Sequence, residues 1–491
     1  MELWSVIAIA AYIFILLSIG YYSYKKTSNI SDYMLGGRGL GPVVTALSAG
    51  ASDMSGWMIM GLPGAVYLTG ISSLWLGIGL TIGAYLNYFL LAPRFRVYTE
   101  VANDSLTVPD YLENRFKDTS NMLRLISGII ILVFFVLYVS SGIVAGGKLF
   151  LDTFGLTYTM GVVVTLAVVI LYTYFGGFLA VSLTDFFQGT LMFITLIMVP
   201  VVTFMNLGVD PGTFVNKVKD IDPSLFDIFK GTSLATIISF LAWGLGYFGQ
   251  PHIIVRFMAI KSPKELKSAR RIGISWMAIG LLGAVASGLT GLVYFTEHKS
   301  PLSDPETVFL RLGDILFHPF ITGIILAAVL AAIMSTISSQ LLVCSSSITK
   351  DFYLTFFNKK ASEKQQMFIG RLSVLIVSAF ATVLAYLPNK TILDIVGQAW
   401  AGFGSSFGPV LLLSLYWKRM TKWGALSGMI VGGLTVIIWI VSGLSGYIYE
   451  MIPGFLLSLI SIIVVSLMTK KPDESINKDF TNMEETLANM K

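Results

Sequence analysis

Charged residues are scarce in this 491-residue chain: they make up 12% of it, whereas 55% of it is hydrophobic. An ordinary soluble protein carries about 25% charged residues, and half that density cannot cover a globule of this size with polar surface. A soluble enzyme and a nucleic-acid-binding protein are therefore excluded. Cysteine occurs once, at Cys344, which excludes an intramolecular disulfide. The three histidines, His252, His298 and His318, lack the spacing of metal ligands.

Long apolar windows recur along the chain. A membrane-crossing helix needs about 20 mostly apolar residues. The sequence predicts 13 such helices, at 4–24, 42–68, 71–92, 123–151, 158–175, 186–207, 233–257, 272–295, 317–347, 369–387, 392–416, 423–443 and 449–469. The first has no basic segment before it, so we expect a retained helix and not a cleaved signal peptide. We expect one all-α transmembrane domain over 1–470 and a polar tail over 471–491, either disordered or a short helix.

Basic residues are divided unevenly between the loops. When the loops are assigned alternately to two sides, 26 of the 33 Lys and Arg residues fall on the side of the odd-numbered loops and the tail. Basic loops stay in the cytoplasm, which predicts an N-terminus outside and a C-terminus inside. An even number of spans would remove this asymmetry. We interpret these residues as contacts to the anionic inner leaflet of the lipid bilayer, with no nucleic-acid partner.

The second window breaks its apolar pattern around Asp53. Gly50 and Gly56 flank this residue, with Ser52 and Ser55 beside it, and these residue types weaken a helix. An unwound turn near the bilayer midplane frees carbonyls for a small cation and N–H groups for a carboxylate. Alternatively, Asp53 caps a kinked helix and pairs with a neighbour. Against this, a carboxylate is more costly than Ser or Asn inside a membrane.

The seventh window contains a second interruption, where three glycines precede Pro251. Trp243, Tyr247 and Pro251 are four residues apart, so an intact helix would present them as one stripe. Such a stripe is a suitable wall for a small, partly apolar ligand, although ordinary aromatic packing would produce the same pattern.

Hydroxyl side chains mark the ninth window. Ser335 and Thr336 could give oxygens to a sodium ion, with Ala332 adding a backbone carbonyl; alternatively, the hydroxyls bond back to the preceding turn of their own helix. The two interrupted windows lie five spans apart, which is typical of a secondary transporter built as an inverted repeat. Spans 2–6 and 7–11 would form the two halves, and spans 1, 12 and 13 would be peripheral.

Several stretches resemble the sodium:solute symporter family. They are 35–38, 48–57, 141–146, 243–252, 331–336 and 400–404, in a likeness that runs from about residue 10 to residue 470. The resemblance implies 13 helices in a leucine-transporter-like fold and a multi-pass protein of the bacterial cytoplasmic membrane. It implies a symporter that couples inward sodium flow to uptake of L-proline by alternating access. Another amino acid, a sugar or pantothenate is an alternative solute on the same fold.

The resemblance also implies roles for individual residues. The sodium site would use backbone oxygens of Ala51, Met54 and Ala332 and the hydroxyls of Ser335 and Thr336. Asp53 and Asp185 would assist sodium binding or lie on its path, and Arg38 would affect coupling from the inner mouth of span 2. Substrate contacts would come from Ser55, Gly56, Trp57, Tyr138, Trp243, Tyr247 and Pro251.

Other functional classes fit the sequence poorly. An enzyme within the membrane would need a cluster of His, Cys or paired carboxylates in the spans, and none is evident in the sequence. A sensor would carry a soluble signalling domain, for which the loops are too short, and a channel would pass current without substrate. We expect no enzymatic activity, no organic cofactor besides the co-transported sodium, and no obligate protein partner.

Overall fold

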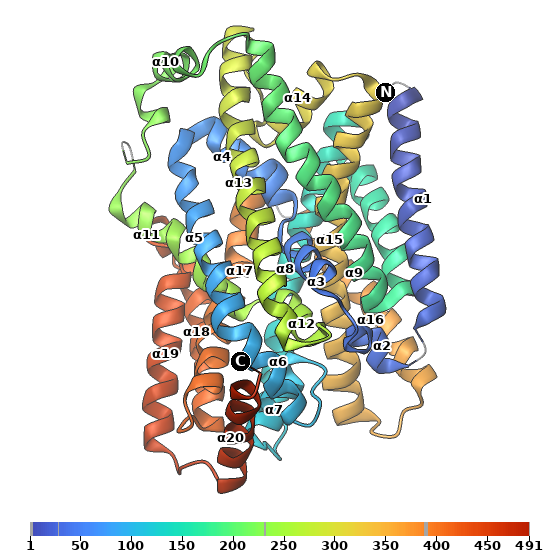
Figure 1. Ribbon diagram of the computed structural model, residues 1–491, viewed down its shortest axis with the longest axis vertical. Helices are drawn as coiled ribbons and strands as arrows, with labels where there is room; N and C mark the ends of the chain where they lie inside the picture. The colour runs from blue at the N-terminus through green and yellow to red at the C-terminus, as the bar shows by residue number, and fades with distance from the viewer. Residues whose placement is uncertain (1–2, 28, 230–231, 387–390, 491) are drawn as a thin grey trace.

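The computed structural model describes residues 3–27, 29–229, 232–386 and 391–490 (Figure 1). Over these ranges the chain is helical and has no strand beyond one isolated bridge, between Leu40 and Ile260. The α-helices are α1 (Leu3–Lys26), α2 (Ile30–Leu35), α3 (Pro42–Asp53), α4 (Leu62–Thr69), α5 (Leu74–Leu86), α6 (Ala92–Val101), α7 (Val108–Phe116), α8 (Met122–Phe154), α9 (Tyr158–Leu207), α10 (Pro211–Ile221), α11 (Leu234–Ala242), α12 (Pro251–Ala259), α13 (Leu266–Glu297), α14 (Val308–Leu316), α15 (Pro319–Ser346), α16 (Glu363–Ala385), α17 (Ile392–Tyr416), α18 (Lys422–Val441), α19 (Met451–Met468) and α20 (Glu474–Ala488).

Shorter turns of other helix types connect or extend these elements. They are the 3₁₀ turns η1 (Gly36–Arg38), η3 (Gly70–Ser73), η5 (Pro223–Phe226), η6 (Trp243–Gly249), η7 (Pro263–Glu265), η8 (Pro305–Thr307) and η10 (Leu444–Gly446), and the π-helical turns η2 (Trp57–Gly61), η4 (Asn87–Leu91) and η9 (Ser347–Phe357). A π-helical turn interrupts predicted span 2, a 3₁₀ turn interrupts predicted span 7, and predicted span 3 contains both types, so these three spans are not regular α-helices throughout. The turn η9 begins at the last residue of predicted span 9.

Helices coincide with each of the predicted windows. Within the described ranges, nine helical segments are long and apolar enough to cross a membrane, and two further apolar helices, Tyr158–Leu171 and Leu234–Gly249, are shorter. Predicted windows five and six lie in the single long helix α9, which bends at Gly177 (φ 58°, ψ −162°). A Cβ at this glycine would lie 2.8 Å from the ring of Tyr33, so both the backbone angles and the space favour glycine. The number of 13 membrane crossings stays a prediction.

Span 2 is interrupted where the sequence predicts. Helix α3 ends at Asp53, Met54 and Ser55 are not helical, and the chain continues through η2 into α4. Because Met54 leaves the helical region (φ −76°, ψ 75°), the main-chain groups at this point are released from the regular helical pattern. The discontinuity predicted from the glycines and serines is confirmed.

Span 7 is also interrupted, in a different way. After α11 the chain tightens into η6 and then becomes extended at Gln250 (φ −85°, ψ 104°), before Pro251 starts α12. Proline is favourable at this first helical position because its missing N–H would have no partner there. Gly83 of α5 explains the close packing of span 7, since a Cβ on it would lie 2.1 Å from the carbonyl oxygen of Gly244.

The interrupted helices lie inside the helical assembly (Figure 1). Helix α3 contacts α9, α12, α13 and α15. In Figure 1, α1 lies at the right edge and α19 at the left edge of the lower half, with α3, α8 and α15 between them. Residues of the α3–α15 contact are therefore shielded on several sides, and Asp53 and Ser335 are both buried.

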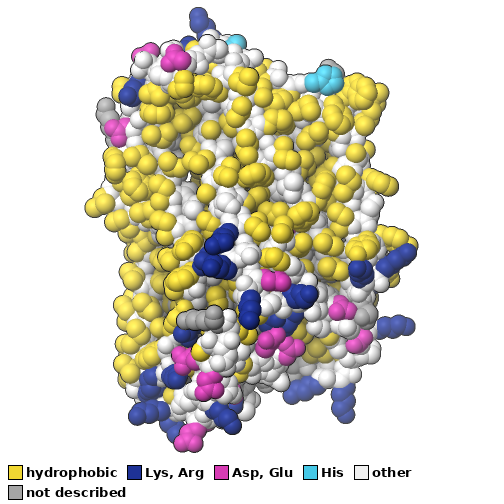
Figure 2. Space-filling model, in the orientation of Figure 1, with side chains coloured by type: hydrophobic (Ala, Val, Ile, Leu, Met, Phe, Trp, Pro, Cys, Tyr) yellow, Lys and Arg dark blue, Asp and Glu magenta, His cyan; other side chains and the backbone are white. Residues whose placement is uncertain are grey.

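The charge pattern needs one correction. Figure 2 shows a broad hydrophobic surface, with most of the visible Lys and Arg side chains in the lower half of the molecule. Not all of the counted bases are loop residues, however, because Arg96, Arg115, Arg124 and Arg256 lie in α6, α7, α8 and α12 with buried side chains. Their burial shows that some bases at this end serve internal ion pairs and cation–π contacts.

The polar tail forms a helix instead of a disordered segment. Helix α20 is amphipathic and packs against α6 and α7. Phe480 and Met483 are buried in this contact, and Lys117 pairs with Asp479 across 2.9 Å. Of the two alternatives predicted for 471–491, the short helix is the one observed.

Candidate functional site

The break in span 2 is held by aromatic side chains that bond to its freed carbonyl. The Nε1–H of Trp57 donates to the backbone oxygen of Asp53 at 3.0 Å, and the hydroxyl of Tyr138 approaches the same oxygen at 3.5 Å. Both aromatic residues are buried. The contacts join the two parts of span 2 to each other and to α8.

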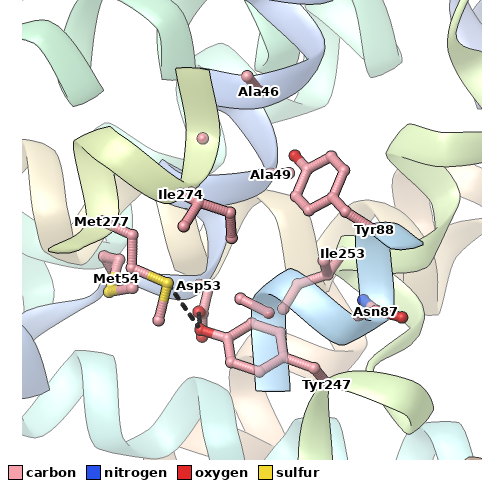
Figure 3. A pocket seen from close by; sticks show the side chains of 13 residues that line it. Ala46, Ala49, Asp53, Met54, Asn87, Tyr88, Tyr247, Ile253, Ile274 and Met277 are labelled. Atoms are coloured by element: carbon pink, nitrogen blue, oxygen red, sulfur yellow. Dashed lines mark hydrogen bonds between the residues drawn. The ribbon is translucent and has the colours of Figure 1, made fainter. Parts of the chain in front are cut away.

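The carboxylate of Asp53 lies in a narrow cavity of about 20 Å³ (Figure 3). One of its oxygens accepts a hydrogen bond from the hydroxyl of Tyr247, on span 7. The other oxygen, Oδ1, is buried and has no hydrogen-bond partner in the described part of the chain. A buried carboxylate oxygen is costly without a donor or a cation, so this side of the cavity is suited to receive one.

Polar groups that the sequence analysis did not single out also line this cavity. Both amide atoms of Asn87 and the hydroxyl of Tyr88 are buried and have no protein partner among the described residues. They come from η4, near the C-terminal end of predicted span 3. A signal was present in the sequence, because Asn87 is an amide inside an apolar window.

Four of the five predicted sodium ligands lie together at the α3–α15 contact. The hydroxyl of Ser335 is 2.7 Å from the carbonyl oxygen of Ala51, and that of Thr336 is 3.4 Å from the same atom. Each hydroxyl is also 3.3 Å from the carbonyl oxygen of Ala332, one turn earlier. The hydroxyls thus bond back to their own helix, as the alternative reading expects, and they also reach across to α3. Their role as sodium ligands stays a prediction. Met54, the fifth predicted ligand, lies buried at the break.

This cluster offers only uncharged oxygens to an ion. Carbonyl and hydroxyl oxygens are hard ligands of the type that small alkali and alkaline-earth cations accept. The nearest charged residue in the sequence is Asp53, which lies two residues after Ala51. The arrangement is suited to reversible binding of a monovalent cation, because no ligand in the cluster carries a charge that would hold it tightly.

The stripe expected for an intact span 7 does not form, because the span is interrupted. Tyr247 faces the Asp53 cavity, whereas Pro251 lines a separate hollow beside α7 and α15. Trp243 stacks on Tyr449 with ring centroids 5.3 Å apart. Trp243 and Tyr247 diverge because residues four apart do not share a face of a 3₁₀ helix, which has 3.0 residues per turn. Pro251 is turned away by the extended residue Gln250 that precedes it. Three of the seven predicted substrate residues therefore point to three different places.

The remaining predicted substrate residues lie at the break. Ser55 and Gly56 fall between Asp53 and Trp57, and a Cβ on Gly56 would lie 2.8 Å from that of Ala145. The hydroxyl oxygen of Ser55 is 3.4 Å from the backbone nitrogen of Trp57. The structure thus brings Ser55, Gly56, Trp57, Tyr138 and Tyr247 together around Asp53, and leaves Trp243 and Pro251 further away.

Trp400 is a residue of the site whose role the sequence analysis missed. Its indole N–H donates to the carbonyl of Trp243 at 2.7 Å, and its ring meets Tyr247 edge-on at 5.0 Å. The side-chain amide of Gln250 donates to the carbonyl of Trp400 at 3.1 Å. Trp400 therefore supports the 3₁₀ turn of span 7. It lies within one of the stretches that carry the family resemblance, which was the available signal.

Asp185 lies in a second buried polar cluster, beside α3. One of its oxygens accepts from Ser48 at 2.7 Å and from Arg256 at 3.1 Å, and all three side chains are buried. Arg256 also donates to Ser339, one turn beyond the Ser335 cluster on α15. Arg256 was counted among the loop bases and was missed as a partner of Asp185, because it lies one residue from the end of its predicted window.

Arg38 lies just before span 2 and binds to neighbouring segments of the chain. Its guanidinium donates to the carbonyl oxygens of Met258 at 2.8 Å and Ser105 at 2.9 Å, and pairs with Asp104 at 2.8 Å. The bridge from Leu40 to the end of α12 adds two backbone hydrogen bonds. Hydrogen bonds thus join the segment before span 2 to the C-terminal end of span 7.

An ion cluster at the N-terminal end of predicted span 4 joins α7 to α8 and η9. Asp110 lies 2.5 Å from a guanidinium nitrogen of Arg124 and 2.6 Å from the ammonium of Lys350. Burial alone would raise the pKa of Asp110, but the charges of Lys350 and Arg124 outweigh burial and hold this pKa below its ordinary value. The carboxylate is therefore ionised at neutral pH and balances two cations.

Curated relatives match the chain along almost its full length. The osmoregulated proline transporter OpuE of Bacillus subtilis (strain 168) is 58% identical over 488 residues, with 99% of each chain covered. The high-affinity proline transporter PutP of the same strain is 59% identical, with 96% of this chain and 100% of the relative covered. A sodium/proline symporter of Staphylococcus aureus (strain NCTC 8325 / PS 47) is 56% identical, with 97% and 95% covered.

Solved structures show the fold. A Na⁺-coupled sialic acid symporter in a substrate-bound outward-open state matches with a TM-score of 0.83 at 20% identity, over 96% of this chain and 99% of that chain. Mhp1, a nucleobase-cation-symport-1 family transporter in a closed conformation, matches with a TM-score of 0.56 at 12% identity, over 92% and 99%. The model of the sodium:solute symporter family matches residues 33–432. The resemblance read from the sequence motifs is thereby confirmed, and the chain belongs to the sodium:solute symporter family.

Proposed function

We propose that this protein couples inward sodium flow to uptake of L-proline across the bacterial cytoplasmic membrane. Relatives at 56–59% identity that match nearly the whole chain are named as proline transporters. The observation that carries the proposal is the meeting of three spans: the neutral oxygens of α3 and α15 lie beside a break whose Asp53 bonds to Tyr247 of span 7.

Sodium binds between α3 and α15 in this proposal. Ala51, Ala332, Ser335 and Thr336 give oxygen ligands, and Met54 adds its carbonyl from the break. An ion in this position fastens the two helices to each other, which favours the conformation in which the break is ordered. Asp53 assists from the break, and Asp185, paired with Arg256, lies on the ion's path to the cytoplasm.

Proline binds beside the ion, at the break. Its carboxylate accepts hydrogen bonds from main-chain N–H groups near Ser55 and Gly56, as anions do at the N-terminus of a half-helix. Its apolar ring packs on aromatic side chains, of which Trp57 and Tyr247 face the break in this conformation. Tyr138 closes the site from α8. Trp243 and Pro251 contribute in a conformation where span 7 has turned toward the break.

The ion gradient drives accumulation. One elementary charge crossing 100 mV supplies about 2.3 kcal/mol, which corresponds to a proline gradient of about 50-fold before the sodium concentration gradient is added. Coupling requires that each ligand stabilises the conformation that the other needs, and this mutual effect is reciprocal by thermodynamic necessity. Arg38 acts at the inner mouth, where opening must break its contacts to the end of α12.

The membrane arrangement belongs to the same proposal. Thirteen helices cross the bilayer, the N-terminus lies outside, and the basic end with α20 lies in the cytoplasm. Spans 2–6 and 7–11 form two inverted halves, with one interrupted helix at the start of each. Alternating access follows when one half rocks against the other.

The test is uptake of radiolabelled proline into proteoliposomes that contain the purified protein. An inward sodium gradient should drive accumulation, whereas potassium or an inward proton gradient alone should not. A competition panel with other amino acids, a sugar and pantothenate tests the alternative solute. Competition by one of these at a lower concentration than unlabelled proline would make that compound the substrate and contradict the assignment.

A further inference from the structure

An open groove lies at the basic end of the molecule, away from the interrupted helices. It has a volume of about 550 Å³ and lies between η4 and α6, the start of α13, the end of α17 and the tail helix α20. In the orientation of Figure 2, Lys and Arg side chains gather in the lower half of the face where α5, α12 and α13 are seen in Figure 1. The groove is therefore at the edge of the hydrophobic surface.

The groove carries an excess of positive charge. Four basic residues line it, Arg94, Lys264, Lys267 and Arg270, against one acid, Glu484. Arg94 pairs with Glu484 at 3.7 Å, and the other three bases form no ion pair with any described residue. Unbalanced cations grouped in a concave site favour an anionic ligand, because the nearby low-dielectric walls focus their field.

Arg270 is held in position by aromatic rings. Its guanidinium lies 5.0 Å from the ring centroid of Tyr85 and 5.3 Å from that of Phe89. These contacts keep the planar guanidinium at one place with its N–H groups available, which suits bidentate binding of a phosphate. Arg94 is fixed in the same manner, 4.1 Å from the ring of Tyr416.

An apolar strip leads away from the basic groove. Ile82, Tyr85 and Phe89 recur at the spacing of one helix face, and they are 52%, 44% and 55% exposed. Within the groove, Leu90 and Leu487 continue this surface. A ligand that fills both parts must combine an anionic head with a long apolar chain, which describes a membrane phospholipid and not a free phosphate.

We propose that this groove binds one anionic phospholipid, with its phosphate on Lys264, Lys267 and Arg270 and an acyl chain along Ile82, Tyr85 and Phe89. Basic pockets between helices at the membrane surface are typical sites for anionic headgroups. Because Leu487 and Glu484 of α20 form the opposite wall, the bound lipid also stabilises the docked tail helix. The proposal does not depend on the transported solute.

The test compares lipid binding by the full-length purified protein and two matched variants. The first replaces the three groove bases, as Lys264→Gln/Lys267→Gln/Arg270→Gln. The control replaces three exposed bases elsewhere in the inner loops, as Lys359→Gln/Lys360→Gln/Lys364→Gln, which removes the same total charge. Native mass spectrometry counts bound phosphatidylglycerol and phosphatidylcholine, and the melting temperature is measured with each lipid added.

The native protein and the control should retain phosphatidylglycerol at least tenfold over phosphatidylcholine, and the groove variant should lose this preference. Equal retention by all three proteins would overturn the proposal. If the triple variant does not fold, Arg270→Gln alone should lower retention severalfold, and unchanged retention in that variant would count equally against the site. Inorganic phosphate should not raise the melting temperature; a rise equal to that given by phosphatidylglycerol would overturn the lipid assignment.

Discussion

The hydroxyl of Tyr247 donates a hydrogen bond to the carboxylate of Asp53, and so joins span 7 directly to the break in span 2 (Figure 3). The two residues carry different predicted roles, since Asp53 was assigned to the ion and Tyr247 to the substrate. Their contact gives a physical route by which a solute at span 7 affects an ion at span 2. Any ligand that draws Tyr247 away leaves both carboxylate oxygens of Asp53 free for another partner.

Replacing Tyr247 by Phe should weaken the coupling between the two ligands. A hydrogen bond to a charged group is worth about 1.5–3 kcal/mol, so we expect the ability of sodium to tighten proline binding to fall about tenfold or more. The measurement is the proline dissociation constant with and without sodium. In an Asp53→Asn background, the same Tyr247→Phe change should have much less effect. Equal effects in both backgrounds would show that the hydrogen bond does not couple the sites.

Removal of either α15 hydroxyl should weaken the binding of sodium more than the binding of proline. Ser335→Ala or Thr336→Ala takes one oxygen from the cluster around Ala51, and we expect the half-saturating sodium concentration for uptake to rise tenfold or more. Ser345→Ala is the matched control on the same helix, because its hydroxyl bonds to Gly370 instead. Unchanged sodium dependence in both site variants would refute the sodium assignment.

Trp400→Phe should weaken proline binding through the shape of span 7. The change removes the indole N–H that holds the carbonyl of Trp243 but keeps an aromatic ring against Tyr247. We expect the KM for proline to rise about fivefold, because roughly 1 kcal/mol of hydrogen bonding is lost. The KM for sodium should change less. Trp417→Phe, just beyond the end of the same helix, should leave both values unaltered. A larger change in the KM for sodium than in the KM for proline would contradict this account.

Asp110→Asn should lower the stability of the folded protein at neutral pH. The substitution removes the ion-pair partner of Lys350 and leaves Arg124 with only Glu113, and breaking a buried ion pair costs about 3 kcal/mol or more. Because the folded-state pKa of Asp110 lies below its ordinary value, its stabilisation is present above the unfolded pKa and is lost as the pH falls through the folded pKa. The melting temperatures of native and variant protein should therefore differ at pH 7 and converge in acid.

The exposed pair of Lys418 and Glu484 supplies the control for this prediction, because the two side chains are 48% and 39% exposed. Lys418→Gln should change the melting temperature little, since exposed ion pairs contribute about 0–1 kcal/mol. A melting temperature for Asp110→Asn equal to that of Lys418→Gln at pH 7 would indicate that the buried cluster does not stabilise the fold.

The positions of the interruptions could be predicted from sequence because they depend on local chemistry. Gly50, Gly56 and Pro251 weaken a helix wherever they occur inside it, and no tertiary contact was needed to infer the breaks. The same holds for the hydroxyls of Ser335 and Thr336, which are conspicuous in an apolar window. The family resemblance supplied Ala51 and Met54, whose backbone oxygens leave no mark in a side-chain pattern.

What the sequence did not predict depends on helix type and on distant contacts. A stripe of Trp243, Tyr247 and Pro251 requires an intact helix with 3.6 residues per turn. The 3₁₀ turn separates Trp243 from Tyr247, and the extended Gln250 separates Pro251 from both. Arg256 carries the same charge as a loop base, and only the fold brings it to Asp185. The buried side of α20 depends on its contact with α6 and α7, which lie far from it in sequence.

The most direct test of the whole account is the mutual effect of the two ligands on purified protein. Proline dissociation constants are measured over a range of sodium concentrations, and sodium dissociation constants over a range of proline concentrations. We predict that each ligand tightens the other at least tenfold and by the same factor, as two ligands that order the same pair of interrupted helices must. Dissociation constants that do not change with the second ligand would contradict the account.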